Sequence, residues 1–276
     1  MELFCHYWPK TEPDAAPLRT NKARLLLLHG LGGTGSLWRP IAASLEESVQ
    51  ILAPDQRGHG RSQNRALTSY SPAEFGQDVN ETLEKQGFLP TVGVGHSMGA
   101  RTLVSAAEQR PDYFSALVLV DLGLSGLAGG GFGTGLSKFL ALLPSEFETR
   151  EKAKDFIQKE CPDPAIGQYL MAVSVRHPDG RVNFPFDHQA LISTLKGAKT
   201  HSIREPLLHL AEKGKEIYIL RGAQSRVWTH EEFLQEKTNF QGLSSAHFLE
   251  FENAGHGLPF EQRTAFTDLL RKILAL

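Results

Sequence analysis

The residues best suited to do chemistry lie in the segment 95–99, which reads GHSMG. It matches G-x-S-x-G, a pattern in which a serine stands on a sharp turn between a strand and a helix. The apolar run at residues 91–94 predicts the strand, and residues 100–109 predict the helix. The residues two positions before and after the serine must be small to avoid a collision, and both are glycines, Gly95 and Gly99. The pattern predicts that Ser97 is a nucleophile.

A serine hydroxyl needs a base to take its proton, and His256 is placed to supply one. It follows the strand-like run 247–251 and lies in a glycine-flanked loop before the helical pattern 260–274. Of the 11 histidines in the chain, we therefore expect His256 to be the base. We expect the side chain of His96 to point away from the reacting atoms, and His29 and His59 to brace loops.

Six short apolar runs could form the elements that position these residues. Most are apolar throughout, which is typical of strands buried on both faces of a parallel sheet. Helical patterns alternate with them, such as residues 72–86, where Phe75, Val79 and Leu83 are spaced four apart. The alternation predicts an α/β fold with a mostly parallel central sheet flanked by helices. The runs are residues 24–28, 49–53, 91–94, 116–120, 216–220 and 247–251.

The alternation breaks between residues 122 and 205. Residues 124–135 are too rich in glycine for a helix or a strand, and helical patterns follow at residues 145–159, 165–175 and 187–196. A structureless loop of this length is uncommon. We therefore expect a core formed by residues 1–121 and 206–276, with residues 122–205 inserted as a helical cap through a flexible hinge.

Composition excludes several classes of protein. The 276 residues include 29 Lys+Arg and 31 Asp+Glu, for a net charge of −2, so the basic excess of a nucleic-acid binder is missing. Two cysteines are too few for a disulfide framework or a multi-cysteine metal site. No apolar run approaches the ~20 residues that span a bilayer, and the N-terminal residues do not resemble a secretory signal. We expect a cytoplasmic protein without stable membrane insertion or a metal.

A second motif suggests a different chemistry. Residues 30–35, GLGGTG, match the dinucleotide-binding pattern G-x-G-x-x-G after a strand, and Asp55 follows about 25 residues later. This interpretation would make the protein an NAD-linked oxidoreductase. Two features count against it: His29 directly precedes the first glycine, and Asp55 continues into a glycine-rich turn with no role in holding a ribose. We expect no cofactor to bind.

Four segments taken together resemble the α/β-hydrolase family. Residues 29–33 (HGLGG) resemble its oxyanion loop, and residues 55–62 (DQRGHGRS) resemble its D-x-x-G-x-G-x-S segment. Residues 95–99 resemble its nucleophile elbow, and residues 254–257 (AGHG) its catalytic-histidine loop. The resemblance runs from about residue 24 to the C-terminus, interrupted by residues 122–205. It implies an eight-stranded sheet, for which the sequence suggests six strands and a possible edge strand within residues 3–8.

The acid that orients the histidine departs from the family's usual pattern. In most of the family it follows the strand before the histidine strand, but the matching position here holds Ser225, which cannot be an anion. One strand earlier, Asp121 ends the run 116–120, and a minority of the family places its acid there. The acid fixes the imidazole tautomer and stabilises the imidazolium. We therefore expect Asp121 to complete a triad with Ser97 and His256.

The resemblance also implies an oxyanion hole made by the backbone N–H groups of Leu31 and Met98. The sequence shows no arginine cluster that could bind a phosphate or carboxylate group. We therefore expect the substrate to carry an apolar acyl group. We expect a serine hydrolase that cleaves small carboxylic esters or thioesters through an acyl-enzyme on Ser97. The alternatives are a carbon–carbon bond hydrolase or lyase with the same triad, and a non-catalytic ligand receptor of the same fold.

Overall fold

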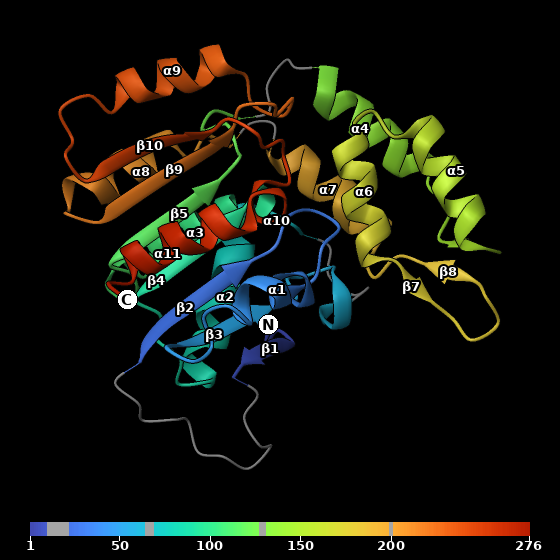
Figure 1. Ribbon diagram of the computed structural model, residues 1–276, viewed down its shortest axis with the longest axis horizontal. Helices are drawn as coiled ribbons and strands as arrows, with labels where there is room; N and C mark the ends of the chain where they lie inside the picture. Colours follow the sequence, from blue (N-terminus) through green and yellow to red (C-terminus); the bar gives the residue numbers. More distant parts are fainter. Residues whose placement is uncertain (10–21, 64–68, 127–130, 199–200) are drawn as a thin grey trace.

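A central sheet of seven strands organises the computed structural model, which describes residues 1–9, 22–63, 69–126, 131–198 and 201–276. The outer strand β1 (Cys5–Trp8) pairs antiparallel with β3 (Val49–Pro54), and all other neighbours are parallel. Beyond these two, the order across the sheet is β2 (Ala23–Leu28), β4 (Val92–His96), β5 (Ala116–Val120), β9 (Glu216–Gly222) and β10 (Ala246–Phe251) (Figure 1).

All six apolar runs are confirmed as strands of this sheet, and the suggested edge strand is β1. The resemblance to the family implied eight strands, whereas the part of the chain described here contributes seven. Because the strands from β3 onward are parallel, their carboxyl ends meet at one edge of the sheet. The loops that carry Ser97, Asp121 and His256 follow β4, β5 and β10, so all three leave from that edge.

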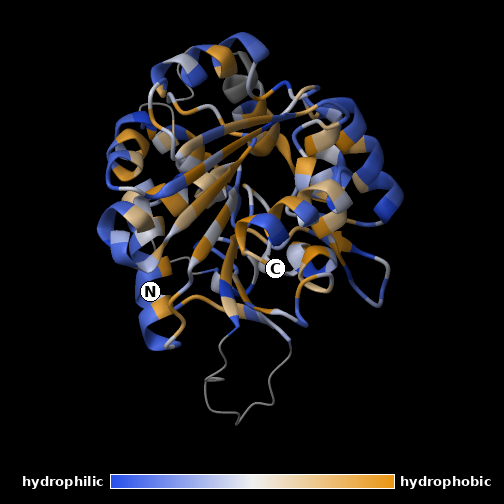
Figure 2. Ribbon diagram, turned by 60° about the vertical axis from the view of Figure 1, so that its left-hand side comes forward, coloured by the Kyte–Doolittle hydropathy of each residue, from blue (hydrophilic) through white to orange (hydrophobic). Residues whose placement is uncertain are grey.

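Helices cover both faces of the sheet, as the apolar runs predicted. Alternate residues of β2 point to opposite faces: Leu26 and Leu28 join one apolar core, and Leu25 and Leu27 join the other. Figure 2 shows apolar strands at the centre and hydrophilic outer faces on the helices. The first core includes residues of α2 (Pro72–Lys85), α3 (Met98–Gln109), α8 (Arg204–Glu212) and α9 (His230–Asn239), and the second includes residues of α1 (Arg39–Ala42), α10 (Leu258–Glu261) and α11 (Arg263–Ile273).

Helix α2 shows how local sequence sets an element that later supports the site. It begins after Ser71, whose hydroxyl accepts a hydrogen bond from the backbone N–H of Glu74 while the Glu74 carboxylate accepts one from the N–H of Ser71. This capping box satisfies two N–H groups that a helix start leaves without partners. Phe75, Val79 and Leu83 are all buried, as their spacing predicted.

Between β5 and α8 the described residues form four helices and a small antiparallel sheet, which lie together on one side of the central sheet (Figure 1). They have an apolar core of their own. Among the described residues, no helix is long and apolar enough to cross a membrane. The elements are α4 (Gly131–Leu142), β6 (Glu146–Phe147), α5 (Arg150–Glu160), α6 (Pro164–Val173), β7 (Val175–Arg176), β8 (Val182–Asn183) and α7 (His188–Ala198).

Three expectations about helices were wrong in part. The glycine-rich stretch does contain a helix, since α4 begins at Gly131; Gly129 and Gly130 lie outside the described residues. Burial of apolar residues later in α4, such as Phe139, offsets its low helix propensity. The helix expected at residues 145–159 begins only at Arg150, because Glu146 and Phe147 pair with β8. The C-terminal helix is divided into α10 and α11 at Gln262, whose φ and ψ are −115° and 45°.

Two Gly→Ala substitutions should have opposite effects on stability. A Cβ at Gly95 would lie 2.4 Å from the carbonyl oxygen of Gly99, so Gly95→Ala should destabilise the protein by at least the ~1–3 kcal/mol typical of overpacking. Gly197, inside α7, has only the Tyr70 carbonyl oxygen nearby, at 3.6 Å. Gly197→Ala should stabilise by up to about 1 kcal/mol, because alanine favours helix. Urea unfolding measures both, and a Gly95→Ala variant as stable as wild type would contradict the packing.

Candidate active site

Ser97 stands on a strained turn between β4 and α3. Its φ and ψ are 52° and −117°, which few non-glycine residues adopt. The chain can turn this tightly because Gly95 and Gly99 have no side chains: a Cβ at Gly99 would lie 2.4 Å from the carbonyl oxygen of Leu28. Ser97 thus precedes the first turn of α3, where the helix dipole favours negative charge.

Asp121 lies at the end of β5 and is fully buried. One carboxylate oxygen, Oδ1, accepts a hydrogen bond from the N–H of Gly222 at 2.9 Å. The other, Oδ2, accepts two: from the hydroxyl of Ser225 at 2.6 Å and from Nδ1 of His256 at 2.7 Å. Because Nδ1 donates its proton to Asp121, Nε2 of His256 is the ring nitrogen left to act as a base.

These contacts keep the Asp121 carboxylate charged. Burial by itself would raise the pKa of this group, because a charge is poorly solvated inside a protein. The hydrogen bonds from His256, Ser225 and Gly222, together with the charge of His256, outweigh burial and hold the pKa of Asp121 below its usual value. The carboxylate is therefore ionised at neutral pH.

Ser225, which stands where most of the family has its acid, touches that acid instead. The carboxylate reaches the same place from β5, one strand over, because β5 and β9 are neighbours and Gly222 ends β9. The Ser225 hydroxyl donates to Asp121 and accepts from the N–H of Val227 at 3.2 Å. The sequence pointed to Asp121 as the acid and attributed no part in the site to Ser225.

The expectation that His96 points away from the reacting atoms is wrong. Its Nε2–H donates a hydrogen bond of 2.7 Å to the backbone carbonyl of His256, and the two rings are 4.8 Å apart. Burial and the charge of His256 lower the pKa of His96 to about 3, so its ring is neutral. His96 therefore holds the loop that carries His256, an arrangement that depends on the proximity of two loops distant in sequence.

Ser97 and His256 line the same pocket. No hydrogen bond joins their side chains within the described structure, whereas the hydrogen bond between His256 and Asp121 is fully formed. In many enzymes the contact between nucleophile and base is loose until substrate binds. The structure thus brings together all three residues expected in the triad.

The loop after β2 lies against the serine. A Cβ at Gly30 would lie 3.4 Å from the Cβ of Ser97. The N–H groups of Leu31 and Met98 donate no hydrogen bond to another described residue, and both residues line the pocket. Two free backbone donors beside a serine are what an oxyanion hole requires.

Two neutral histidines brace this loop, as expected. Nε2 of His59 accepts a hydrogen bond of 3.0 Å from the N–H of Gly32, and Nε2 of His29 accepts one of 3.0 Å from the N–H of Gln56. Burial lowers the pKa of His29 to about 4 and that of His59 to about 3. Both rings therefore stay neutral and keep a nitrogen that can accept a hydrogen bond.

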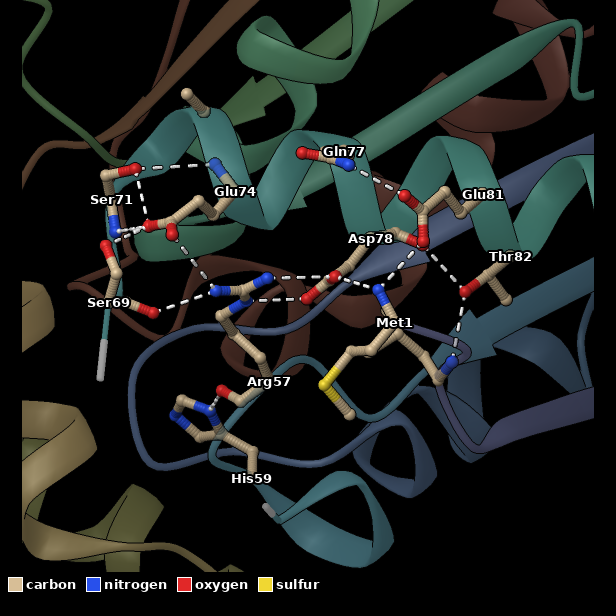
Figure 3. A network of polar contacts seen from close by, with 12 residues as sticks. Met1, Arg57, His59, Ser69, Ser71, Glu74, Gln77, Asp78, Glu81 and Thr82 are labelled. Carbon is tan, nitrogen blue, oxygen red and sulfur yellow. Dashed lines mark hydrogen bonds and ion pairs between the residues drawn. The ribbon is translucent and has the colours of Figure 1, made fainter. Parts of the chain in front are cut away.

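The segment that carries His59 is itself tied to α2 (Figure 3). The Arg57 guanidinium makes two parallel hydrogen bonds to the buried Asp78 carboxylate, at 2.6 and 2.9 Å. Nδ1–H of His59 donates to the carbonyl oxygen of Arg57 at 2.9 Å. The well-capped helix α2 thus supports the loop beside Ser97 through a chain of polar contacts.

Asp55, the acidic residue of the dinucleotide pattern, has a structural role. Its oxygens accept hydrogen bonds from the N–H of Gly35 at 2.7 Å, the N–H of Arg61 at 2.9 Å and Nε2 of His6 at 3.1 Å. It is 2% exposed, so it is not available to a ribose. The glycines of residues 30–35 shape the turn beside Ser97 instead.

The pocket around Ser97 is mainly apolar. The sequence showed no arginine cluster, but it did not reveal that the buried Arg101 lines this pocket. The Arg101 guanidinium donates to the carbonyl oxygens of Gly123, Ser125 and His201, which lie near the two ends of residues 122–205. The apolar lining residues are Leu31, Met98, Leu122, Leu136, Leu140, Ile166, Leu170, Leu191, Leu195 and Val227.

Residues 25–269, nearly the whole chain, match the alpha/beta hydrolase family. The chain belongs to this family. The structure agrees with this match. Its sheet is mostly parallel, and Ser97 lies on a turn between a strand and a helix. Residues 30–35 lie within the matched segment and follow β2.

Relatives of the chain are hydrolases of several kinds. The sn-1-specific diacylglycerol lipase ABHD11 of Mus musculus is 26% identical over 260 residues, covering 91% of this chain and 80% of that protein. A marine microorganism esterase has the same fold, with a TM-score of 0.77 and 20% identity over 98% of both chains. The thioesterase domain from the curacin biosynthetic pathway has a TM-score of 0.68 and 23% identity, covering 96% of this chain and 94% of its own. The relatives support a hydrolase.

The buried histidines should make the fold sensitive to acid. The pKa values of His29, His59 and His96 lie at about 4, 3 and 3, whereas the unfolded chain takes up these protons near pH 6.5. The unfolded state thus binds more protons below about pH 6.5, and each histidine should cost up to ~1.4 kcal/mol of stability per pH unit as the pH falls to its folded pKa. Urea unfolding between pH 4 and pH 8 measures this slope.

A matched pair of variants tests the origin of the slope. His59→Gln keeps an acceptor for the N–H of Gly32 but cannot be protonated. The change in the free energy of unfolding per pH unit should therefore fall by the amount that corresponds to one proton, about 1.4 kcal/mol. Thr267→Ser, at a buried site that carries no titratable group, should leave the slope unchanged. A wild-type stability that is constant from pH 4 to pH 6.5 would show that the buried rings do not resist protonation.

Proposed function

We propose that the protein is a serine hydrolase that cleaves carboxylic esters or thioesters. Ser97 Oγ attacks the acyl carbonyl carbon while Nε2 of His256 takes its proton. His256 then gives this proton to the leaving alcohol or thiol, and the acyl group stays on Ser97. Water, deprotonated by His256, attacks the acyl-enzyme and releases the acid. Asp121 keeps the imidazole in the required tautomer and stabilises its charged form.

The observation that carries this proposal is the hydrogen bond of 2.7 Å between Nδ1 of His256 and the buried, ionised Asp121. This hydrogen bond leaves Nε2 of His256 free to act as a base, and His256 lines the same pocket as Ser97. In the tetrahedral intermediate, the free N–H groups of Leu31 and Met98 receive the negative oxygen. Oxyanion donors of this kind supply a large part of the rate enhancement in acyl transfer.

The pocket favours a small apolar acyl group. Its free volume is about 80 Å³, several times the ~10–15 Å³ that one water molecule needs. Leucine side chains dominate its walls, and Arg101, which also lines it, donates to backbone carbonyls. The lipase, esterase and thioesterase among the relatives all act on acyl compounds by name, which agrees with this assignment.

We also propose that residues 122–205 act as a cap that selects the substrate, on a core of residues 1–121 and 206–276. Side chains from α4, α6 and α7 contribute to the pocket that contains Ser97 and His256. A substrate at Ser97 would therefore lie between the carboxyl edge of the sheet and this insertion.

Ser97→Ala should abolish turnover. Hydrolysis of p-nitrophenyl butyrate should fall by roughly 10⁴–10⁶-fold, because without the hydroxyl no acyl-enzyme forms. The variant should also lose covalent labelling by a fluorophosphonate, which reacts only with an activated serine. Ser105→Ala removes a buried hydroxyl from the same helix, α3, and should retain both properties. A non-catalytic receptor of this fold would show no labelling even as wild type.

The acid can be tested by two further substitutions. Asp121→Asn should reduce kcat by on the order of 10⁴-fold, because an amide cannot stabilise the imidazolium and favours the wrong tautomer. Ser225→Ala removes one hydrogen bond to Asp121 but keeps the charge, so it should cost about tenfold or less. Steady-state kinetics on the same ester distinguish the two. Near-normal kcat in Asp121→Asn would remove Asp121 from the proposed triad.

A further inference from the structure

The carbonyl oxygen of Gly30 is held by three hydrogen-bond donors. Nδ1–H of His29 donates at 2.8 Å, the backbone N–H of Gly33 at 3.0 Å and the hydroxyl of Tyr169 at 3.3 Å. The first two donors belong to the same loop as Gly30. The third comes from α6, which lies about 140 residues further along the chain.

This carbonyl shares a peptide unit with the N–H of Leu31. Because the peptide group is planar and trans, its C=O and N–H point in opposite directions. Donors that fix the direction of the Gly30 carbonyl thus fix the direction in which the Leu31 N–H points. Hydrogen bonds to a carbonyl also polarise the peptide and strengthen its N–H as a donor.

The position of Tyr169 fits close contact with this loop. Its side chain lines the pocket with Ser97 and His256, and its ring lies 6.0 Å from that of His96. A Cβ at Gly33 would lie only 1.9 Å from the Tyr169 hydroxyl oxygen, so the phenol reaches the loop because position 33 has no side chain. Burial raises the pKa of Tyr169, and the neutral phenol keeps the proton that it donates.

We propose that Tyr169 is a positioning residue for the oxyanion hole: its hydroxyl, supplied by the insertion, orients the Gly30–Leu31 peptide so that the Leu31 N–H faces the developing negative charge. The inference rests on the proposed function, since it assigns a role to Tyr169 in the reaction of Ser97. Tyr169 need not touch the substrate. It makes the geometry of the oxyanion hole depend on where α6 lies.

Tyr169→Phe isolates this role, because it removes the hydroxyl and keeps the ring that shapes the pocket. Loss of an oxyanion donor itself costs about 10²–10³-fold in kcat. Tyr169 is one of three groups that hold the donor, so its loss should lower kcat by about tenfold and leave KM within about twofold. Tyr218→Phe removes the hydroxyl of a tyrosine outside the pocket lining and should change neither constant.

A boronic acid tests the oxyanion hole directly. Phenylboronic acid forms a tetrahedral adduct with a catalytic serine, and its negative oxygen occupies the place of the oxyanion. The inhibition constant for phenylboronic acid should rise in Tyr169→Phe by the same factor as kcat falls, because both measure affinity for the transition state. A purely structural role would instead lower stability or raise KM and leave the ratio of boronate affinity to substrate affinity unchanged.

The outcomes separate this inference from the proposed function. An active, fluorophosphonate-labelled wild type whose Tyr169→Phe variant keeps its kcat and boronate affinity would overturn the role of Tyr169 alone. A wild type that neither hydrolyses esters nor binds the boronic acid would overturn the proposed function, and the role of Tyr169 with it. A parallel loss of kcat and boronate affinity at constant KM would support both.

Discussion

The buried charge of Asp121 is the interaction on which the arrangement of the site depends. An unpaired carboxylate in a protein interior costs many kcal/mol, and here three hydrogen bonds offset that cost. The donors come from the end of β9, from the loop after it and from the loop after β10. The carboxylate is thus stable only when β5, β9 and β10 lie side by side in the observed register.

Backbone strain is concentrated at the same edge of the sheet. Ser97 and Asp121 both have positive φ, at 52° and 51°, and each such conformation costs on the order of 1–3 kcal/mol. Both residues directly follow strands that are buried along their whole length. The buried strands hold the two residues in place: Ser97 lines the pocket, and the Asp121 carboxylate contacts His256 behind it.

The loops around Ser97 also join the sheet to the insertion. The N–H of Gly60 donates to the carbonyl of Pro185 at 2.6 Å, and the N–H of Asp187 donates to the carbonyl of Gly58 at 2.9 Å. Leu170 of α6 also packs against the loop after β2, since a Cβ at Gly32 would lie 3.0 Å from its Cδ2. Backbone hydrogen bonds therefore join the insertion to the segment that carries His59, which braces the loop after β2.

Local patterns in the sequence determined the strands, α2, the serine turn and the histidine loop. Each depends on neighbouring residues alone: apolar runs, a capping box, or glycines that permit one tight turn. Asp121 could also be proposed as the acid, because it ends a strand that must reach the same sheet edge. The tertiary structure decided the rest. It set the hydrogen bonds of Ser225 to Asp121, of His96 to the His256 carbonyl and of Tyr169 to the Gly30 carbonyl. It also decided that a glycine-rich stretch contains a helix. These features rest on hydrogen bonds and burial between segments far apart in the chain, and no local pattern specifies which distant groups will meet.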